Sequence, residues 1–277
     1  MITGYENKPI GTLCFLSDNR LEHVVTQVKA ILKEFAGEWR CLIVTGEIKR
    51  NKTLVKDFRK LCQSSNMVEH LEIKKGLEFQ RIVPEAFKVL SAINSVKTKY
   101  FSFVDLDHSI SLAGLRKITI LLSEKKAIGA IRGSVCSIEK HRKIAKNPFQ
   151  SLEFKPGTGI ENFGLCSFSS IGVFYNKKIL VESKILERFE ANLRAHRDYP
   201  LVCLNILLAA NFSTCFSPIE VFIKTGDNYS FPDKMSEYFS WHSFGQRCDQ
   251  LIALRNTIFE GFVDVQKLSS HREFFAK

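Results

Sequence analysis

Short apolar strands alternate with amphipathic helices in the first part of the chain, and this order limits the folds open to it. Residues 11–16 and 40–45 are apolar runs, and each is followed by apolar residues at helical spacing. The pattern repeats with a stretch over 68–73 and a helical stretch over 82–96, which leads into the apolar run 100–104. Strands separated by helices pair in parallel, with helices on both faces of the sheet. We therefore expect an α/β fold with a mostly parallel central sheet.

The length and composition fit one folded domain with an appendage. The 277 residues allow one large domain or a domain plus an extension, and a hydrophobic content of 45% is enough for a sizeable core. The segment from residue 235 onward has a helical pattern, so we divide the chain into a main domain over residues 1–220 and a mainly helical extension over residues 221–277. The eight cysteines contain no C-x-x-C pair and mostly lie in apolar runs. Such cysteines are expected to be buried and reduced, as in a cytoplasmic protein.

The chain is basic, with a net charge of +11. A surface of this sign attracts nucleotide phosphates, nucleic acid or an anionic membrane face. The N-terminus shows no signal-peptide pattern, and the longest apolar stretch, residues 199–218, is interrupted by polar residues and cannot cross a bilayer. We therefore expect a cytoplasmic protein whose contact with the inner face of an anionic membrane would be peripheral.

Two aspartates one residue apart, Asp105 and Asp107, follow the apolar run 100–104. Residues alternate sides along a strand, so both carboxylates can point the same way from its carboxyl end, where ligands bind in α/β sheets. Two such carboxylates repel each other unless a cation or a shared proton relieves the repulsion. Their oxygens suit Mg²⁺ or Mn²⁺, and a bound cation would in turn bind a diphosphate. The alternative is a strand that ends in an ordinary polar turn.

The same pair is compatible with a haloacid dehalogenase-like phosphatase. In that class of enzyme Asp105 would be the nucleophile and Asp107 the acid or base. Ser109 stands where the phosphatase motif usually has Thr, and the pair lies over a third of the way along the chain instead of in the first strand. The position of the motif therefore disfavours this alternative.

Two further segments accompany the acidic pair. Gly76 and Arg81 precede it, at the spacing of a Gly-x-x-x-Ala-Arg-Asn segment, and His196-Arg-Asp-Tyr-Pro-Leu201 follows it and leads into an apolar helix. Together with the acidic pair, these segments make the chain resemble the family 2 glycosyltransferases of the GT-A fold over approximately residues 10–215. The chain departs from the family at Gln80 and at Arg197, which replaces a Glu. It also has Thr45-Gly46-Glu47 in place of an Asp-Asp-Gly-Ser segment.

The resemblance implies a Rossmann-like GT-A fold and a metal-dependent, inverting glycosyltransferase. Such an enzyme would move a sugar from a nucleoside diphosphate sugar to a hydroxyl of a glycan or lipid-linked saccharide, as in the assembly of bacterial surface polysaccharides. Asp107 would bind Mn²⁺ or Mg²⁺ directly, and Asp105 would contact the ribose or reach the metal through water. Asp198 would be the catalytic base for the acceptor hydroxyl, although an aspartate just before a helix is also a common helix cap.

Three further residues are candidates for the site. Asp18 ends the first apolar run and would bind the nucleoside, although capping of the next helix explains it equally well. Arg81 would pair with the diphosphate, or would lie on the surface at the start of a helix. His242, next to Trp241, would be a late metal ligand or a structural residue in an aromatic cluster.

A nucleic-acid-binding module is the alternative from another class, because the net charge is +11. It predicts aromatic residues interleaved with Lys and Arg on an exposed face, whereas most Phe residues here lie in apolar runs. We therefore expect no nucleic-acid partner. The basic run over residues 139–146 is typical of a solvated helix face or a loop, and the alternative is a flap that contacts phosphate.

Overall fold

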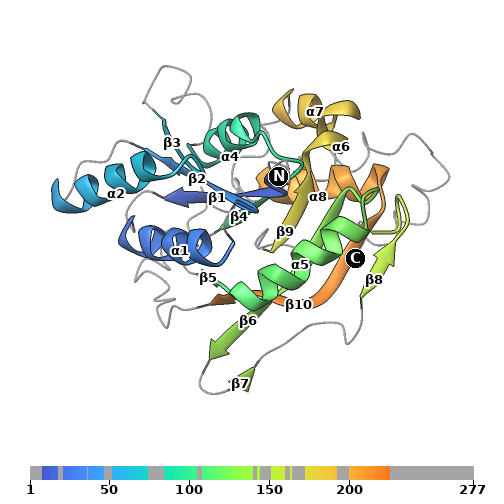
Figure 1. Cartoon of the computed structure of the whole chain (residues 1–277). Coiled ribbons are helices and arrows are strands. Elements are labelled where there is room, and N and C mark those ends of the chain that lie inside the picture. The colour runs from blue at the N-terminus through green and yellow to red at the C-terminus, as the bar shows by residue number, and fades with distance from the viewer. Residues whose placement is uncertain are drawn as a thin grey trace, which may run out of the picture.

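A computed structural model of the chain describes the segments that carry the sheet and its covering helices. Ten strands in these segments form one sheet, which seven helices cover (Figure 1). The described residues are 8–17, 21–35, 37–46, 52–73, 84–104, 108–139, 142–143, 151–159, 163, 172–191 and 200–224.

The strands range in length from two to 11 residues. Their bounds are β1 Gly11–Ser17, β2 Trp39–Thr45, β3 Val68–Glu72, β4 Tyr100–Val104, β5 His108–Ile110, β6 Ala130–Glu139, β7 Arg142–Lys143, β8 Leu152–Phe154, β9 Val173–Asn176 and β10 Thr214–Lys224. The helices have the bounds α1 Leu21–Glu34, α2 Lys52–Ser64, α4 Pro84–Ser95, α5 Leu112–Glu124, α6 Lys177–Glu182, α7 Ile185–Ala191 and α8 Pro200–Asn211.

The described part of the sheet is mostly parallel. Its strands follow the order β3-β2-β1-β4-β9-β6-β10-β5, with β7 paired to β6 and β8 to β10. The first four strands in this order are parallel to one another, and β6 is parallel to β10. Strand β9 lies antiparallel between β4 and β6, and β5 is antiparallel to β10. Along this order only β9 and β5 run against the other strands, which confirms the expected α/β class.

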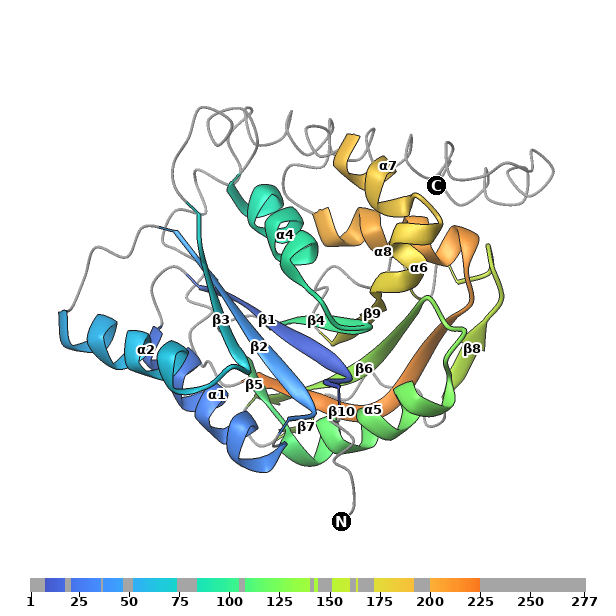
Figure 2. The ribbon, with the colours of Figure 1, turned by 45° about the horizontal axis from the view of Figure 1, so that its top comes forward.

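Helices cover both faces of the sheet, and each face has its own core. Helices α1, α2 and α5 pack on one face, and α4, α6, α7 and α8 pack on the other (Figure 2). Side chains alternate along β1, so Leu13 and Phe15 enter the first core while Cys14 enters the second. A strand buried on both faces needs apolar residues at successive positions, which explains why this run is continuously apolar.

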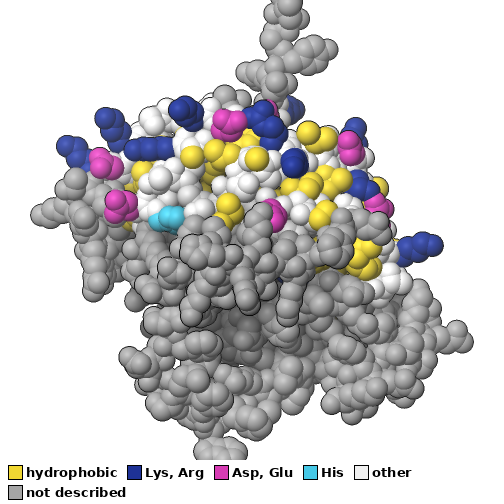
Figure 3. All heavy atoms as spheres, turned by 90° about the horizontal axis from the view of Figure 1, so that it is seen from below, with side chains coloured by type: hydrophobic (Ala, Val, Ile, Leu, Met, Phe, Trp, Pro, Cys, Tyr) yellow, Lys and Arg dark blue, Asp and Glu magenta, His cyan; other side chains and the backbone are white. Residues whose placement is uncertain are grey.

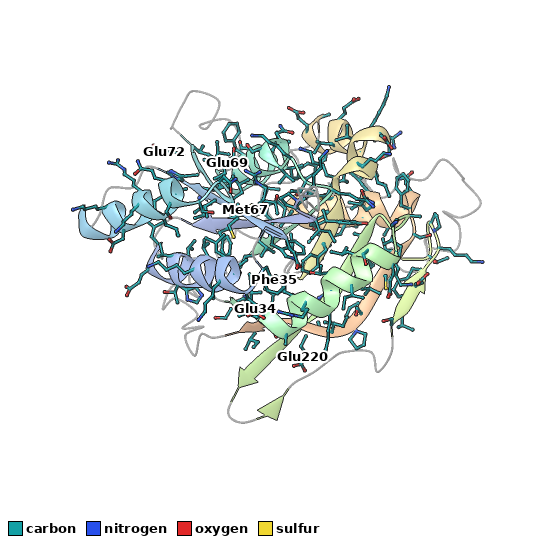
Figure 4. The ribbon with its side chains drawn as sticks, viewed as in Figure 1. Glu34, Phe35, Met67, Glu69, Glu72 and Glu220 are labelled. Atoms are coloured by element: carbon teal, nitrogen blue, oxygen red, sulfur yellow. The ribbon has the colours of Figure 1, made fainter. Side chains whose placement is uncertain are left out.

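Helices α1 and α5 are joined at their surfaces as well as through the core. The Arg116 guanidinium of α5 pairs with the Glu34 carboxylate at the end of α1 and lies 5.7 Å from the ring centroid of Phe35. Figure 4 shows Glu34 and Phe35 between the two helices. The two helices therefore contact each other at the surface and share one core with β1 and β4.

Strand β10 is longer than the sequence pattern indicates. The sequence predicts a short strand after Pro218, whereas β10 runs from Thr214 to Lys224 and contains this proline. The register to β6 shifts between Phe216 and Glu220, which is how a strand accommodates a proline that cannot donate to the ladder. Strand β10 also passes through residue 220, where we placed the boundary of the main domain, and residues 225–277 lie outside the described ones.

The basic run over residues 139–146 contains a short strand. Residues Arg142 and Lys143 pair antiparallel with Glu139 and Ile138 of β6, so this part is a hairpin and not a helix face. The prediction of a helix or loop was therefore wrong at these two residues. Residues 140–141 and 144–146 lie outside the described part of the chain.

Candidate active site

The carboxyl ends of four neighbouring parallel strands define the candidate site. Ser17 at the end of β1 is aligned with Thr45 at the end of β2, and Thr45 is aligned with Glu72 at the end of β3. Val104 at the end of β4 pairs with Phe15, two residues before the end of β1. The segments that follow these four strands therefore leave the sheet from one edge, as expected for a ligand site in an α/β fold.

The site residues singled out from the sequence lie outside the described residues, and three of them adjoin this edge in the chain. Asp18 follows Ser17 directly, and Asp105 and Asp107 lie between Val104 and His108. Helix α8 begins at Pro200, two residues after Asp198. The roles predicted for the following six residues stay predictions: Asp18, Arg81, Asp105, Asp107, Asp198 and His242.

The segment that follows the acidic pair is held on both of its edges. On one side β5 pairs antiparallel with β10, with His108 opposite Lys224 and Ile110 opposite Phe222. On the other side the Gln27 side chain of α1 donates from Nε2 to the His108 carbonyl at 2.9 Å and accepts at Oε1 from the Ile110 amide at 3.0 Å. Gln27 and His108 are both buried. The sequence pattern gave no indication that Gln27 contacts this segment.

His23 lies one helical turn before Gln27 and contacts the same amide. The distance from Gln27 Nε2 to His23 Nε2 is 2.7 Å, while His23 Nε2 lies 3.4 Å from the His108 carbonyl. A tautomer with the proton on Nδ1 lets His23 Nε2 accept one N–H of the amide while the other N–H goes to the His108 carbonyl. The two backbone partners, the His108 carbonyl and the Ile110 amide, define which end of the Gln27 amide carries the nitrogen.

The chain immediately after β5 starts helix α5 with well-defined hydrogen bonds. The Ser111 amide donates to the Val221 carbonyl at 2.7 Å, and the Ser111 hydroxyl accepts from the Gly114 amide at 3.1 Å as the N-cap. The backbone from His108 to Gly114 is therefore bonded to α1, to β10 and to itself. This part of the candidate site is a fixed element.

A second polar group lies between β2 and β3 at the same sheet edge. Thr45 Oγ1 lies 2.9 Å from His70 Nε2, and the Phe58 ring meets the imidazole edge-on, with 4.7 Å between ring centroids. Burial lowers the pKa of His70 from its usual value, and this outweighs the nearby Glu72 carboxylate, which raises it. Figure 4 places Glu72 at the end of β3. The imidazole is therefore held neutral more readily than a free one.

Most of the described thiols are buried. Cys14, Cys41, Cys203 and Cys215 are buried, and Cys62 is half-buried. Burial raises the pKa of Cys41 to about 12 and that of Cys14 further, so neither forms a thiolate readily near neutral pH. For these cysteines, the expectation of mostly buried thiols is confirmed.

The described residues hold no further candidate centre for this chemistry. No group of three His, Cys, Asp or Glu side chains suited to a metal occurs among them. A surface depression of about 450 Å³ lies between α5 and β10, beside Lys117 and Glu220, and none of the residues predicted for the site lines it. No helix of the described segments is long and apolar enough to span a membrane.

The chain is similar to known proteins in fold but not in sequence. No protein-family model matches it, and no curated protein matches it significantly. The structure of residues 1–349 of S. aureus TarS, a glycosyltransferase, matches with a TM-score of 0.59 at 12% identity, over 90% of this chain and 80% of that one. The same part of TarS in complex with UDP-GlcNAc matches with a TM-score of 0.54 at 16% identity, over 79% of this chain and 59% of that one.

A third structure shows how much of the whole protein is shared. S. aureus TarS matches with a TM-score of 0.55 at 14% identity, over 78% of this chain but only 36% of its own length. Identities this low show the fold alone. The chain thus has a mixed α/β fold of the Rossmann-like type found in GT-A glycosyltransferases.

Proposed function

We propose that this protein is a glycosyltransferase that uses a nucleoside diphosphate sugar, with its active site at the carboxyl edge of β1, β2 and β4. The observation that carries the proposal is the end of β4, where Val104 directly precedes Asp105 at the same sheet edge as Ser17 and Thr45. TarS, which shares the fold, has been crystallised with UDP and with UDP-GlcNAc. A UDP-sugar is therefore the first donor to test.

A divalent cation fits the chemistry of the residues after β4. Asp105 and Asp107 offer carboxylate oxygens, which are ligands that Mg²⁺ and Mn²⁺ accept, and Mg²⁺ needs few protein ligands because it keeps waters and borrows phosphate oxygens. When bound, the cation would offset the charge that develops on the departing diphosphate. The chain's own part is to present both carboxylates from one strand end.

Asp198 is the proposed base of the transfer reaction. It would accept the proton of the acceptor hydroxyl as that oxygen forms a bond to the anomeric carbon and the bond from this carbon to the diphosphate breaks. An in-line attack of this kind inverts the anomeric configuration. The proposed acceptor is a glycan or a lipid-linked saccharide, and the +11 charge would favour an acceptor on an anionic membrane.

The described part of the lower face gives little support to the nucleic-acid alternative. Figure 3 shows Lys and Arg side chains interspersed with Asp and Glu over the described part of the lower face. A groove for a nucleic-acid backbone needs positive charge along a continuous path, with exposed aromatic side chains between. Salt-sensitive binding to any DNA or RNA, without binding of a nucleotide sugar, would favour that alternative.

A thermal-shift panel tests the proposal. UDP-, GDP-, CDP- and dTDP-sugars are compared with and without Mn²⁺, and a true donor at 100 times its Kd should stabilise the fold by about 2.7 kcal/mol. Asp107→Ala should remove the Mn²⁺-dependent part of the response. The matched control is Asp57→Ala, because Asp57 is an exposed aspartate on α2, remote in the chain from the site.

Two outcomes would count against the proposal. The first is a panel in which no nucleotide sugar stabilises the protein and no nucleoside diphosphate is released with any saccharide acceptor. The second is release of phosphate from simple esters without a nucleotide sugar, which would favour the phosphatase reading of Asp105. Asp198→Asn should keep donor binding and lose transfer, which separates the base from the donor site.

A further inference from the structure

We propose that Gln27 is a positioning residue for the acidic pair, an inference that rests on the proposed function. Its side-chain amide binds the backbone of β5, and β5 begins at the residue covalently joined to Asp107. Gln27 would thereby set where the chain carrying Asp105 and Asp107 leaves the sheet edge. It would touch neither the donor nor the cation.

The hydrogen bonds of Gln27 take the place of those that a neighbouring strand would form with β5. The His108 carbonyl and the Ile110 amide flank Ser109 and point to the same side of β5, away from β10. Among the described strands β5 is the last in the order of the sheet, so no described strand pairs with these two groups on that side. One amide supplies both a donor and an acceptor at 2.9 and 3.0 Å, so it completes the edge as a neighbouring strand would.

The support behind Gln27 is rigid. Gln27 is only 9% exposed, and it lies on the face of α1 that also carries the buried residues Val24, Val28 and Ile31. These side chains pack in the same core as Leu13 and Phe15 of β1. The position of the β5 backbone is therefore tied to the strand whose end forms the neighbouring part of the site.

The acceptor and the donor on β5 set the orientation of the amide. His23 Nε2 lies 2.7 Å from the Gln27 nitrogen and accepts its second N–H when the ring proton is on Nδ1. A reversed amide would place oxygen against the His108 carbonyl and nitrogen against the Ile110 amide, and both bonds would be lost.

A cation site needs its ligands held to within a fraction of an ångström, and consecutive Cα atoms are only about 3.8 Å apart. A shift of His108 therefore reaches Asp107 directly.

Gln27→Leu tests the proposal, because leucine is of similar size and forms neither bond. Donor stabilisation by a UDP-sugar is measured in the full chain as a function of Mn²⁺ concentration. We expect the Mn²⁺ concentration for half the effect to rise at least tenfold. Thr26→Ala is the matched control, since Thr26 is an exposed residue of the same helix, and it should leave this concentration unchanged. An unchanged Mn²⁺ requirement in Gln27→Leu would overturn the proposal.

Hydrogen exchange without any ligand gives a second readout that does not depend on the activity. Peptides covering residues 105–110 should exchange at least tenfold faster in Gln27→Leu than in the wild type or in Thr26→Ala, and unchanged exchange would overturn the proposal.

Gln27→Asn is the second variant if leucine prevents folding, because the shorter amide cannot reach both backbone groups. If the wild type ignores every nucleotide sugar while exchange still depends on Gln27, the proposed function fails and the clamp on β5 stands.

Discussion

The Tyr175 hydroxyl donates a hydrogen bond to Asn205 Oδ1 at 2.8 Å, and both side chains are fully buried. This bond joins β9 at the centre of the sheet to α8, the helix that follows the proposed base Asp198 in the chain. Asn205 Nδ2 is buried and has no hydrogen-bond partner among the described residues. The pair is therefore a half-satisfied polar group inside an apolar core.

The first prediction concerns this pair. Tyr175→Phe should lower the free energy of unfolding by about 1–3 kcal/mol, because it leaves Asn205 Oδ1 without a donor while the ring can still stack on Phe101. The double variant with Asn205→Leu should recover most of the loss, since both polar groups are then removed. Urea denaturation of the two single variants and the double variant measures this cycle. Additive losses would contradict the prediction.

The second prediction concerns the close approach of α5 to β10. A Cβ atom on Gly114 would lie 1.9 Å from the Glu220 carbonyl oxygen, which is backbone and cannot move aside cheaply. Gly114→Ala should therefore lower the free energy of unfolding by about 1–3 kcal/mol, although alanine favours a helix. Ser123→Ala, at an exposed position of the same helix, should change it by less than about 0.5 kcal/mol. Equal effects of the two substitutions would rule out this steric explanation.

The third prediction concerns acid sensitivity at His70. Because burial lowers its pKa in the folded state, the unfolded chain takes up a proton first as the pH falls below about 6.5, the usual value. Protons therefore favour the unfolded state in this window, and stability should decrease from about pH 6.5 downward. His70→Gln should show a shallower decrease in the urea midpoint between pH 7.5 and 5.5. A decrease as steep as in the wild type would assign the effect to other groups.

The fourth prediction concerns the thiols. With iodoacetamide at pH 8 on the native protein, Cys62 should be labelled before Cys14, Cys41 and Cys203, because Cys62 is half-buried and the others are buried. The three buried thiols also have strongly raised pKa values from burial, so they should react only after denaturation. Peptide mass spectrometry separates the sites. Early labelling of Cys14 would contradict this assignment.

The local sequence pattern was sufficient to predict the strands and helices that are long enough to show a hydrophobic period. The expected strand over residues 11–16 lies within β1, and the expected helical stretch over residues 82–96 contains α4. Strands β5 and β7 have three and two residues, which is too short to show a period in the sequence. The antiparallel insertion of β9 depends on pairing between residues far apart in the chain, and no local pattern encodes it.

In the candidate site too, features set by the local sequence pattern could be predicted, whereas those set by contacts between distant residues could not. The sheet edge could be predicted, because Ser17 and Val104 end apolar runs and parallel strands place their carboxyl ends together. Gln27 could not be predicted, because its partners are more than 80 residues away and its position on a helix resembles that of any polar residue. His70 likewise gains its role only from Phe58 and Thr45, which reach it from other elements.

The position of β9 has a consequence for how the protein is made. Tyr175 is paired with Phe101 of β4 on one side and with Ala130 of β6 on the other. While the ribosome is still synthesising residues before Val173, both of these neighbouring strands have an open edge that could pair with another chain. In the nascent protein β4 and β6 therefore lack their common neighbour until β9 is synthesised, and β6 keeps its other edge open until β10 follows.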